Sequence, residues 1–287
     1  MRDFSAGPQG LSINTATVRK QWRLDRIIDE CARRGIHAIS PWRDQVAAVG
    51  LDAVARRLRD AGVALSGYCR GGFYPAKDAS GLAAALADNR QAVDEARALN
   101  APCLVLVVGS LPGALDGHAA HKDIGRARGE VRDGIAATLE YARQAGMPLA
   151  IEPLHPMQAA ERACINTLEQ ALDLCDELDP ARSGALGVAV DLYHVWWDPK
   201  LAAQIARAGR ERLLAYHVCD WLTPTRDLLN DRGMMGDGVI ELRKVRGWME
   251  AAGYAGHAEV EIFSNHWWAQ PGEQVLDTCL ARHRSVV

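Results

Sequence analysis

The sequence predicts an α/β fold: one (β/α)₈ barrel, with residues 1–287 forming a single domain. Three observations support this prediction. Short runs of Val, Ile, Leu and Ala alternate with longer amphipathic segments, which is typical of a parallel sheet. Eight such pairs fit a chain of 287 residues, because a barrel of this kind needs about 250 residues. The glycine-rich turn after the first strand of many doubly wound sheets is absent, since ATVRKQW follows here.

The expected elements follow from these periodic patterns. Strands are predicted over residues 11–15, 36–40, 63–68, 103–108, 148–153, 185–191, 213–220 and 257–263. Helical spacing of apolar residues predicts helices over residues 25–35, 51–62, 89–100, 131–146 and 167–178, and several of these patterns end in glycine. Two longer connections, 109–130 and 221–238, have the length of functional lids. For the first of them, a disordered insertion is the alternative.

Composition excludes several classes of protein. The chain has 36 acidic and 33 basic residues and no basic stripe, which argues against nucleic acid as the main partner. Its 7 cysteines are scattered without a C-x-x-C motif, which argues against a disulfide framework and a cysteine zinc site. We find neither a signal peptide nor an apolar run of about 20 residues, so we expect no membrane partner and a cytoplasmic location.

Polar residues interrupt or end each of the last four predicted strands: Glu152, Asp191, His217 and Glu261. The carboxyl ends of barrel strands meet at one mouth, so these side chains should converge there. Three crowded carboxylates repel one another unless a cation lies among them. The set therefore predicts one divalent metal ion, Mn²⁺ first, with Mg²⁺, Co²⁺ or Zn²⁺ as alternatives. Glu259 competes with Glu261, which we prefer because it lies nearer the end of its strand.

Motifs in the second half of the chain carry a family resemblance. The order of IEP, VDLYH, HVCD, DRGMMGDG and VEIF resembles the sugar phosphate isomerase/epimerase superfamily, whose xylose-isomerase-like barrels include ketose 3-epimerases and inosose isomerases and dehydratases. The resemblance covers most of the chain and is strongest from Glu152 to Phe263. It implies that the four residues above hold one metal ion and that Glu152 and Glu261 also form an acid/base pair. It also places His194 and Arg232 on substrate oxygens.

Three further side chains are candidates for substrate binding. Arg70 follows the third predicted strand and precedes two glycines, a setting in which it would bind a carboxylate or hydroxyl groups. Trp42, at the end of the second strand, suits packing against the C–H surface of a sugar. His155 either orients Glu152 or touches substrate. Each side chain also has a purely structural interpretation: a surface arginine, a packed tryptophan and a hydrogen-bonded histidine.

The predicted function is that of a metal-dependent isomerase or epimerase. It would abstract a proton next to a carbonyl in an unphosphorylated keto sugar or inosose, since the chain has no phosphate-binding loop. A lyase or dehydratase on the same scaffold is the alternative, and a metal-free sugar-binding barrel is a third. An abasic-site endonuclease is disfavoured because Asp231-Arg232-Gly233 replaces the D-x-H pair that it needs. The expected partners are a small sugar or cyclitol and further copies of the chain, in a homodimer or homotetramer.

Overall fold

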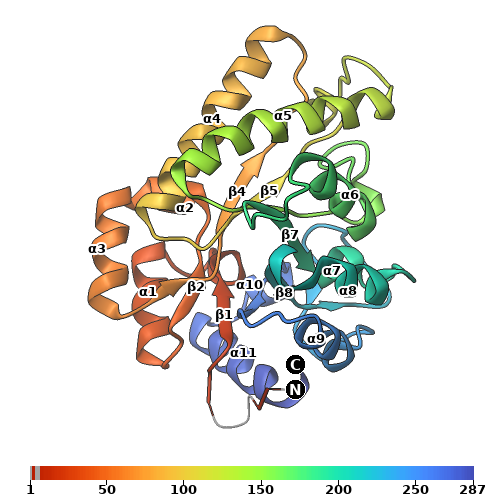
Figure 1. Ribbon diagram of the computed structural model, residues 1–287. Coiled ribbons are helices and arrows are strands. Elements are labelled where there is room, and N and C mark those ends of the chain that lie inside the picture. Colours follow the sequence, from red (N-terminus) through yellow and green to blue (C-terminus); the bar gives the residue numbers. More distant parts are fainter. Residues whose placement is uncertain (1, 4–6) are drawn as a thin grey trace.

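The computed structural model describes residues 2–3 and 7–287. Among these residues, nine parallel strands form one sheet in the order β3-β2-β1-β11-β8-β7-β6-β5-β4, surrounded by helices (Figure 1). The strands are β1 (Leu11–Asn14), β2 (Ala38–Ser40), β3 (Ala64–Leu65), β4 (Tyr68–Gly72), β5 (Leu104–Val107), β6 (Leu149–Ile151), β7 (Leu186–Asp191), β8 (Leu213–Val218) and β11 (Ala258–Val260). A short antiparallel pair, β9 (Asp220–Trp221) and β10 (Arg232–Gly233), lies in the 221–238 connection. The predicted (β/α)₈ barrel is confirmed.

Helices connect the strands around the outside of the barrel (Figure 1). The α-helices are α1 (Leu24–Arg33), α2 (Arg43–Val49), α3 (Leu51–Ala61), α4 (Ala79–Ala98), α5 (Ile124–Ala145), α6 (Leu168–Leu178), α7 (Leu192–Val195), α8 (Leu201–Arg212), α9 (Leu242–Ala251), α10 (Asn265–Trp268) and α11 (Gly272–Val286). Short 3₁₀ turns are η1 (Thr15–Val18), η2 (Ala114–Asp116) and η3 (Pro156–Gln158). In the described part of the chain, no helix combines the length and the apolar character that a bilayer-spanning segment needs.

Two helices begin earlier than the sequence pattern predicts. α4 starts ten residues before position 89 because Asp78 caps it, with the backbone N–H of Gly81 donating to the Asp78 side chain over 2.8 Å. α5 starts at Ile124 because Asp123 accepts from the backbone N–H of Arg126 over 3.0 Å. The first turns of these helices carry few buried residues, so apolar periodicity did not reveal them. The 109–130 connection is therefore partly helical.

The third barrel strand is split, contrary to the single strand predicted over 63–68. β3 pairs with β2, whereas β4 pairs with β5, and an isolated parallel bridge links Cys69 of β4 to Trp42, which follows β2, so that the barrel is nearly closed. A Cβ atom on Gly72, whose φ is +109°, would lie 1.9 Å from the carbonyl oxygen of Val107, so glycine permits this close approach of β4 to β5. Arg70 lies within β4, so the prediction that it follows the third strand is wrong.

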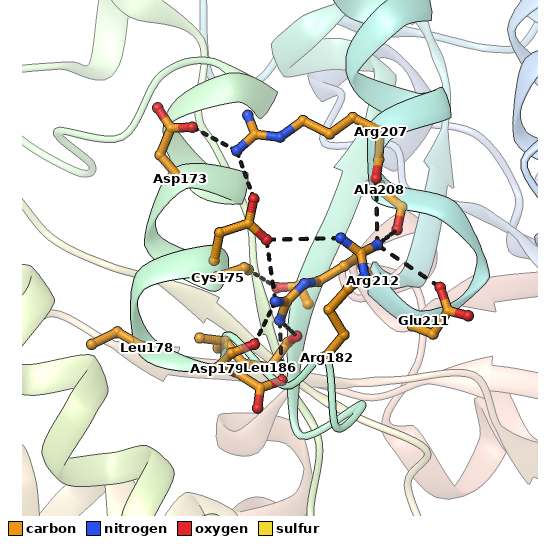
Figure 2. A network of polar contacts seen from close by, with 12 residues as sticks. Asp173, Cys175, Leu178, Asp179, Arg182, Leu186, Arg207, Ala208, Glu211 and Arg212 are labelled. Atoms are coloured by element: carbon orange, nitrogen blue, oxygen red, sulfur yellow. Dashed lines mark hydrogen bonds and ion pairs between the residues drawn. The ribbon is translucent and has the colours of Figure 1, made fainter.

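A buried ionic network fastens α6 to the start of β7 and the end of α8 (Figure 2). Fully buried Arg212 donates to the Asp179 carboxylate over 3.1 Å and to the carbonyl oxygens of Asp179 and Leu186 over 2.6 and 2.8 Å. Half-exposed Arg207 binds Asp173 and Asp176 at its outer edge. Because Leu186 opens β7, the network lies at the amino-terminal end of the barrel, where residues support stability rather than chemistry.

We expect Arg212→Lys to lower the free energy of unfolding by about 2 kcal/mol, because lysine keeps the charge but cannot reproduce the planar fork of donors. Arg207→Lys is the matched control. It makes the same arginine-to-lysine change in a partly exposed ion pair, where the free energy of unfolding should fall by less than about 1 kcal/mol. Urea denaturation followed by circular dichroism measures both. Equal losses in the two variants would contradict the importance given to the buried contacts.

Candidate metal centre and active-site cavity

Glu152, Asp191, His217 and Glu261 converge at the carboxyl ends of four neighbouring strands, β6, β7, β8 and β11. One ligating atom from each lies within 4.8 Å of all the others, and all four side chains are buried. The backbone fixes two of them in place: the N–H of Glu152 donates to β5 over 3.0 Å, and the N–H of Glu261 donates to β8 over 3.1 Å. The structure thus brings together the ligand set predicted from the sequence.

The donor atoms of this cluster fit a single divalent cation. Nδ1 of His217 lies 3.1 Å from Oε1 of Glu152 and 3.5 Å from Oε2 of Glu261, yet the ring nitrogens and this Glu152 oxygen make no hydrogen bond within the described residues. Buried polar atoms without a partner are costly. Ligands about 2 Å from a common ion stand at such separations from one another. Three carboxylates and one imidazole suit Mn²⁺, Mg²⁺, Co²⁺ or Zn²⁺.

Arg232 lies among the acidic side chains. Its Nη1 donates to Oδ2 of Asp191 over 2.9 Å and to Oε2 of Glu261 over 3.0 Å, and its guanidinium lies 4.5 Å from the ring centre of Tyr193 and 5.2 Å from that of Phe263. The crowded carboxylates predict a divalent ion, and the family resemblance predicts that Arg232 binds substrate oxygens. In the structure Arg232 compensates part of the negative charge of the carboxylates, so it shares this role with the predicted ion, and it also lines the cavity.

Asp191 has two roles in this arrangement. Its Oδ1 accepts from the backbone N–H of Tyr193 over 2.8 Å and so caps α7, while Oδ2 faces Arg232. Burial opposes ionisation of Asp191, but the charges of Arg232, His194 and His217 and the hydrogen bond from Tyr193 together outweigh burial and hold the pKa of this carboxyl well below its usual range. Asp191 therefore stays ionised at neutral pH, as a metal ligand must.

Of the two histidines predicted to contact substrate, His194 lines the cavity and His155 does not. His194 lines the cavity, accepts the backbone N–H of His155 at Nδ1 over 3.1 Å and has Nε2 3.2 Å from Nη2 of Arg232. Burial lowers the pKa of His194 to about 3, so the ring is neutral. His155 does not line the cavity: its ring stacks on Trp221, with centroids 4.8 Å apart. The predicted contact of His155 with substrate therefore finds no support in this geometry.

A cavity of about 450 Å³ opens above the cluster. Glu152 and Glu261 line it, whereas Asp191 and His217 lie behind its wall. Aromatic and basic side chains form the rest of the wall, and Leu228, Leu229 and Asn230 of the 221–238 connection also contribute to it. The other predicted lid, the 109–130 connection, contributes no residue to the cavity wall. A partly apolar cavity with a few convergent polar groups is the usual form of a small-molecule site.

Trp42 is in the cavity wall, as the sequence analysis expected of a substrate-binding residue. Its indole N–H donates to the Asn14 side chain over 2.8 Å, which fixes the ring, and the ring meets Phe263 edge to face at 5.4 Å. Trp268 continues this wall beyond Phe263, at 5.9 Å between ring centres. The resulting aromatic surface suits the C–H face of a carbohydrate. Arg70 also lines the cavity.

Glu259 is a buried carboxylate whose role the sequence analysis missed. It accepts from Nδ2 of Asn14 over 2.8 Å and from Oγ of Ser66 over 2.7 Å, and its Oε1 lies 3.5 Å from Nε2 of His217. From the sequence, Glu259 and Glu261 are alternatives for one ligand position. Since alternate residues of a strand face the same side, both point into the barrel, with Glu259 one layer deeper. It lies behind the histidine, where a carboxylate orients a metal-ligating ring.

Two of the converging side chains bind protons more tightly than usual. Burial opposes charge on the His217 ring, but Glu259, Glu152 and Glu261 outweigh it and raise the pKa of His217 well above its usual range. Burial raises the pKa of Glu261 from 4.5 to about 7 against the opposing charge of Arg232. Because the folded pKa of Glu261 exceeds its unfolded value, its contribution favours the metal-free fold below pH 4.5 and is lost as the pH rises through about 7.

Metal affinity is expected to rise with pH, because a cation binds the deprotonated forms of His217 and Glu261. Binding of Mn²⁺ should release more protons at pH 6 than at pH 8, because Glu261, with a pKa of about 7, is mostly protonated only at the lower pH. Isothermal titration calorimetry in buffers of different ionisation enthalpy measures both the affinity and the proton release. An affinity that is equal at pH 6 and pH 8 would contradict this assignment of protons.

Comparison with known proteins agrees with this architecture. The model of the xylose isomerase-like TIM barrel family matches residues 28–282. The solved structure of protein SMc04130 from Sinorhizobium meliloti 1021 is 57% identical, with a TM-score of 0.92, and the match covers 97% of this chain and 98% of that one. An IolI protein with a bound zinc atom shares the fold at 18% identity, with a TM-score of 0.82 and the same coverage of both chains.

A curated relative gives a second line of comparison. The inosose isomerase of Halalkalibacterium halodurans is 22% identical over 209 residues, which are 72% of this chain and 69% of that protein. The family match spans nearly the whole barrel, including β6, β7, β8 and β11 with their converging side chains. The chain belongs to the family of xylose isomerase-like TIM barrels.

Proposed function

We propose that this protein is a divalent-metal-dependent isomerase or epimerase of an unphosphorylated keto sugar or inosose. The observation that carries the proposal is the convergence of three carboxylates and one imidazole within 4.8 Å beside an aromatic-walled cavity of about 450 Å³. Membership of a sugar isomerase/epimerase-like barrel family and the inosose isomerase relative support the class of reaction. The zinc atom of the IolI structure supports a divalent cation in this type of barrel.

Glu152, Asp191, His217 and Glu261 would hold the cation. When bound, a divalent ion acts as a Lewis acid that polarises a substrate carbonyl and stabilises the enediolate formed by proton loss beside it. We favour Mn²⁺ for this oxygen-rich set, with Mg²⁺, Co²⁺ and Zn²⁺ as alternatives. Glu259, whose Oε1 lies 3.5 Å from Nε2 of His217, would support the site from behind as the charge partner of this ring.

Glu152 and Glu261 are the proposed acid and base. They line the cavity from β6 and β11, which are separated in the sheet by β7 and β8, so the two carboxylates approach a ligand from different sides. One removes the proton next to the carbonyl, and the other returns a proton to the opposite face, which inverts that carbon. If one carboxylate performs both transfers, the proton moves between neighbouring carbons.

Hydrogen exchange in deuterated water tests this proposal. The Mn²⁺-loaded protein is incubated with ketohexoses, inososes and 3-keto-glucosides, and products are followed by NMR and mass spectrometry. Deuterium gain beside the carbonyl without loss of mass supports isomerisation or epimerisation. Formation of an enone or release of an aglycone would instead assign the protein as a lyase. Binding of metal without exchange on any of these substrates would overturn the proposed reaction.

A further inference from the structure

The cavity wall contains both acidic and basic side chains. Its carboxylates, Glu152 and Glu261, both belong to the metal-binding cluster. Besides Arg232, which donates to Asp191 and Glu261, the wall contains four cationic side chains: Arg19, Lys20, Arg70 and Arg162. Three of these, all but Lys20, also line an adjoining hollow beside Trp42 that neither glutamate lines. The cationic part of the wall therefore continues into a hollow that lacks the two carboxylates of the cluster.

Two of these cations already have a partner. Arg19 forms an ion pair with Asp44 and lies 5.8 Å from the ring centre of Trp42. Lys20 extends over the ring of Trp268 at 5.9 Å and is largely exposed to solvent. The ion pair compensates the charge of Arg19 and water solvates that of Lys20, so neither side chain needs a ligand.

Arg70 and Arg162 lack an acidic partner. The Arg70 guanidinium stacks on the ring of Phe73 at 4.2 Å, but no carboxylate of the described residues forms an ion pair with it. Arg162 is anchored through its backbone, which donates to Gln158 and accepts from Gly109, while its side chain has no ion pair or hydrogen bond in the described part of the chain. Both residues are partly shielded from water.

Burial and a nearby like charge make the positive charge of Arg70 energetically unfavourable. Burial, followed by the positive charge of Arg162, lowers the pKa of Arg70 below its ordinary value. A half-buried cation near a like charge is unfavourable unless an anion is present. The residues on either side of Arg70 in β4 pair with β5, which fixes the backbone at this position.

We propose that Arg70 and Arg162 bind an anionic group of the substrate, a carboxylate or a phosphate ester, while the carbonyl end of the same molecule lies at Glu152 and Glu261. Planar guanidinium groups match both anions through paired, charge-assisted hydrogen bonds. This inference rests on the proposed function and narrows its substrate to a sugar or cyclitol that bears an acidic group. The predicted absence of phosphate favours a sugar acid.

Binding of three unreactive probes tests the inference without requiring turnover. D-Glucitol, D-gluconate and D-glucitol 6-phosphate share a six-carbon chain and differ chiefly in their terminal group. Isothermal titration calorimetry of the Mn²⁺-loaded protein should show at least tenfold tighter binding of an anionic probe than of glucitol. Arg70→Met and Arg162→Met should each reduce this preference about tenfold, and the double variant should abolish it.

Arg56→Met, an exposed arginine of α3, is the control and should keep the full preference. Unchanged thermal melting and Mn²⁺ content establish that the variants are folded. A preference for gluconate supports a sugar acid, and a preference for the phosphate supports the anion site but contradicts the unphosphorylated substrate. Equal binding of all three probes, or a preference that survives in the double variant, would overturn the inference. If the preference for an anionic probe is observed but no keto sugar exchanges hydrogen, the anion site is supported and only the proposed reaction is refuted.

Discussion

Glu152→Gln and Glu261→Gln should each lower turnover by about 10³-fold, because each removes a proton-transfer group and replaces it with an amide that cannot accept a proton at neutral pH. Both changes keep the side-chain volume. Each variant also replaces a charged metal ligand, so part of the loss would come from weaker metal binding. Saturating Mn²⁺ separates the two effects, because it restores occupancy without restoring the base.

Hydrogen exchange in deuterated water and the metal content of each variant are the required measurements. Glu140→Gln is the matched control, since it makes the same change on the exposed surface of α5. It should leave both exchange and metal content unaltered. If either cavity variant at saturating Mn²⁺ exchanges hydrogen as fast as the unmodified protein, the acid/base assignment fails for that residue.

Arg232→Met should lower the free energy of unfolding of the metal-free protein by about 3–5 kcal/mol. The change removes a buried cation that donates to Asp191 over 2.9 Å and to Glu261 over 3.0 Å, and it leaves their charges uncompensated. A divalent ion binds the same carboxylates, so saturating Mn²⁺ should recover a large part of this loss. The variant should thus depend on metal for its stability much more than the unmodified protein does.

Thermal and urea denaturation with and without Mn²⁺ measure this dependence. Arg226→Met changes an exposed arginine of the same 221–238 connection and serves as the control. We expect it to alter the free energy of unfolding by less than about 0.5 kcal/mol, whether or not metal is present. An Arg232→Met protein whose stability does not respond to Mn²⁺ would show that the carboxylates do not share a cation.

The sequence predicts the barrel well because strand–helix alternation is a repeated local signal. Strand–helix alternation does not predict the split of the third strand, since the split involves the contact of Gly72 with Val107, and these residues lie far apart in the chain. The starts of α4 and α5 were missed for a different reason. Their first turns face solvent, so hydrogen bonds to Asp78 and Asp123 mark these starts and apolar periodicity does not.

The candidate site likewise combines features that local sequence patterns predict with features that they do not. The four converging side chains were predictable because a fixed rule relates strand ends to the mouth of a barrel. The inward direction of Glu259 was also available from strand alternation, had that rule been applied to both glutamates. The contact of Arg232 with two carboxylates, and the approach of Arg162 to Arg70, depend on how long connections fold back over the barrel. No local pattern reports such tertiary contacts.

The converging acids and the histidine all come from adjacent strands β6, β7, β8 and β11, whereas Trp42, Arg70 and Phe73 come from the first half of the chain. The four candidate metal ligands thus lie between residues 152 and 261, whereas the cavity wall draws on both halves of the chain, with Arg162 and Trp268 from the second. Substitution of the wall residues from the first half would therefore change the shape and charge of the cavity while leaving all four converging side chains in place.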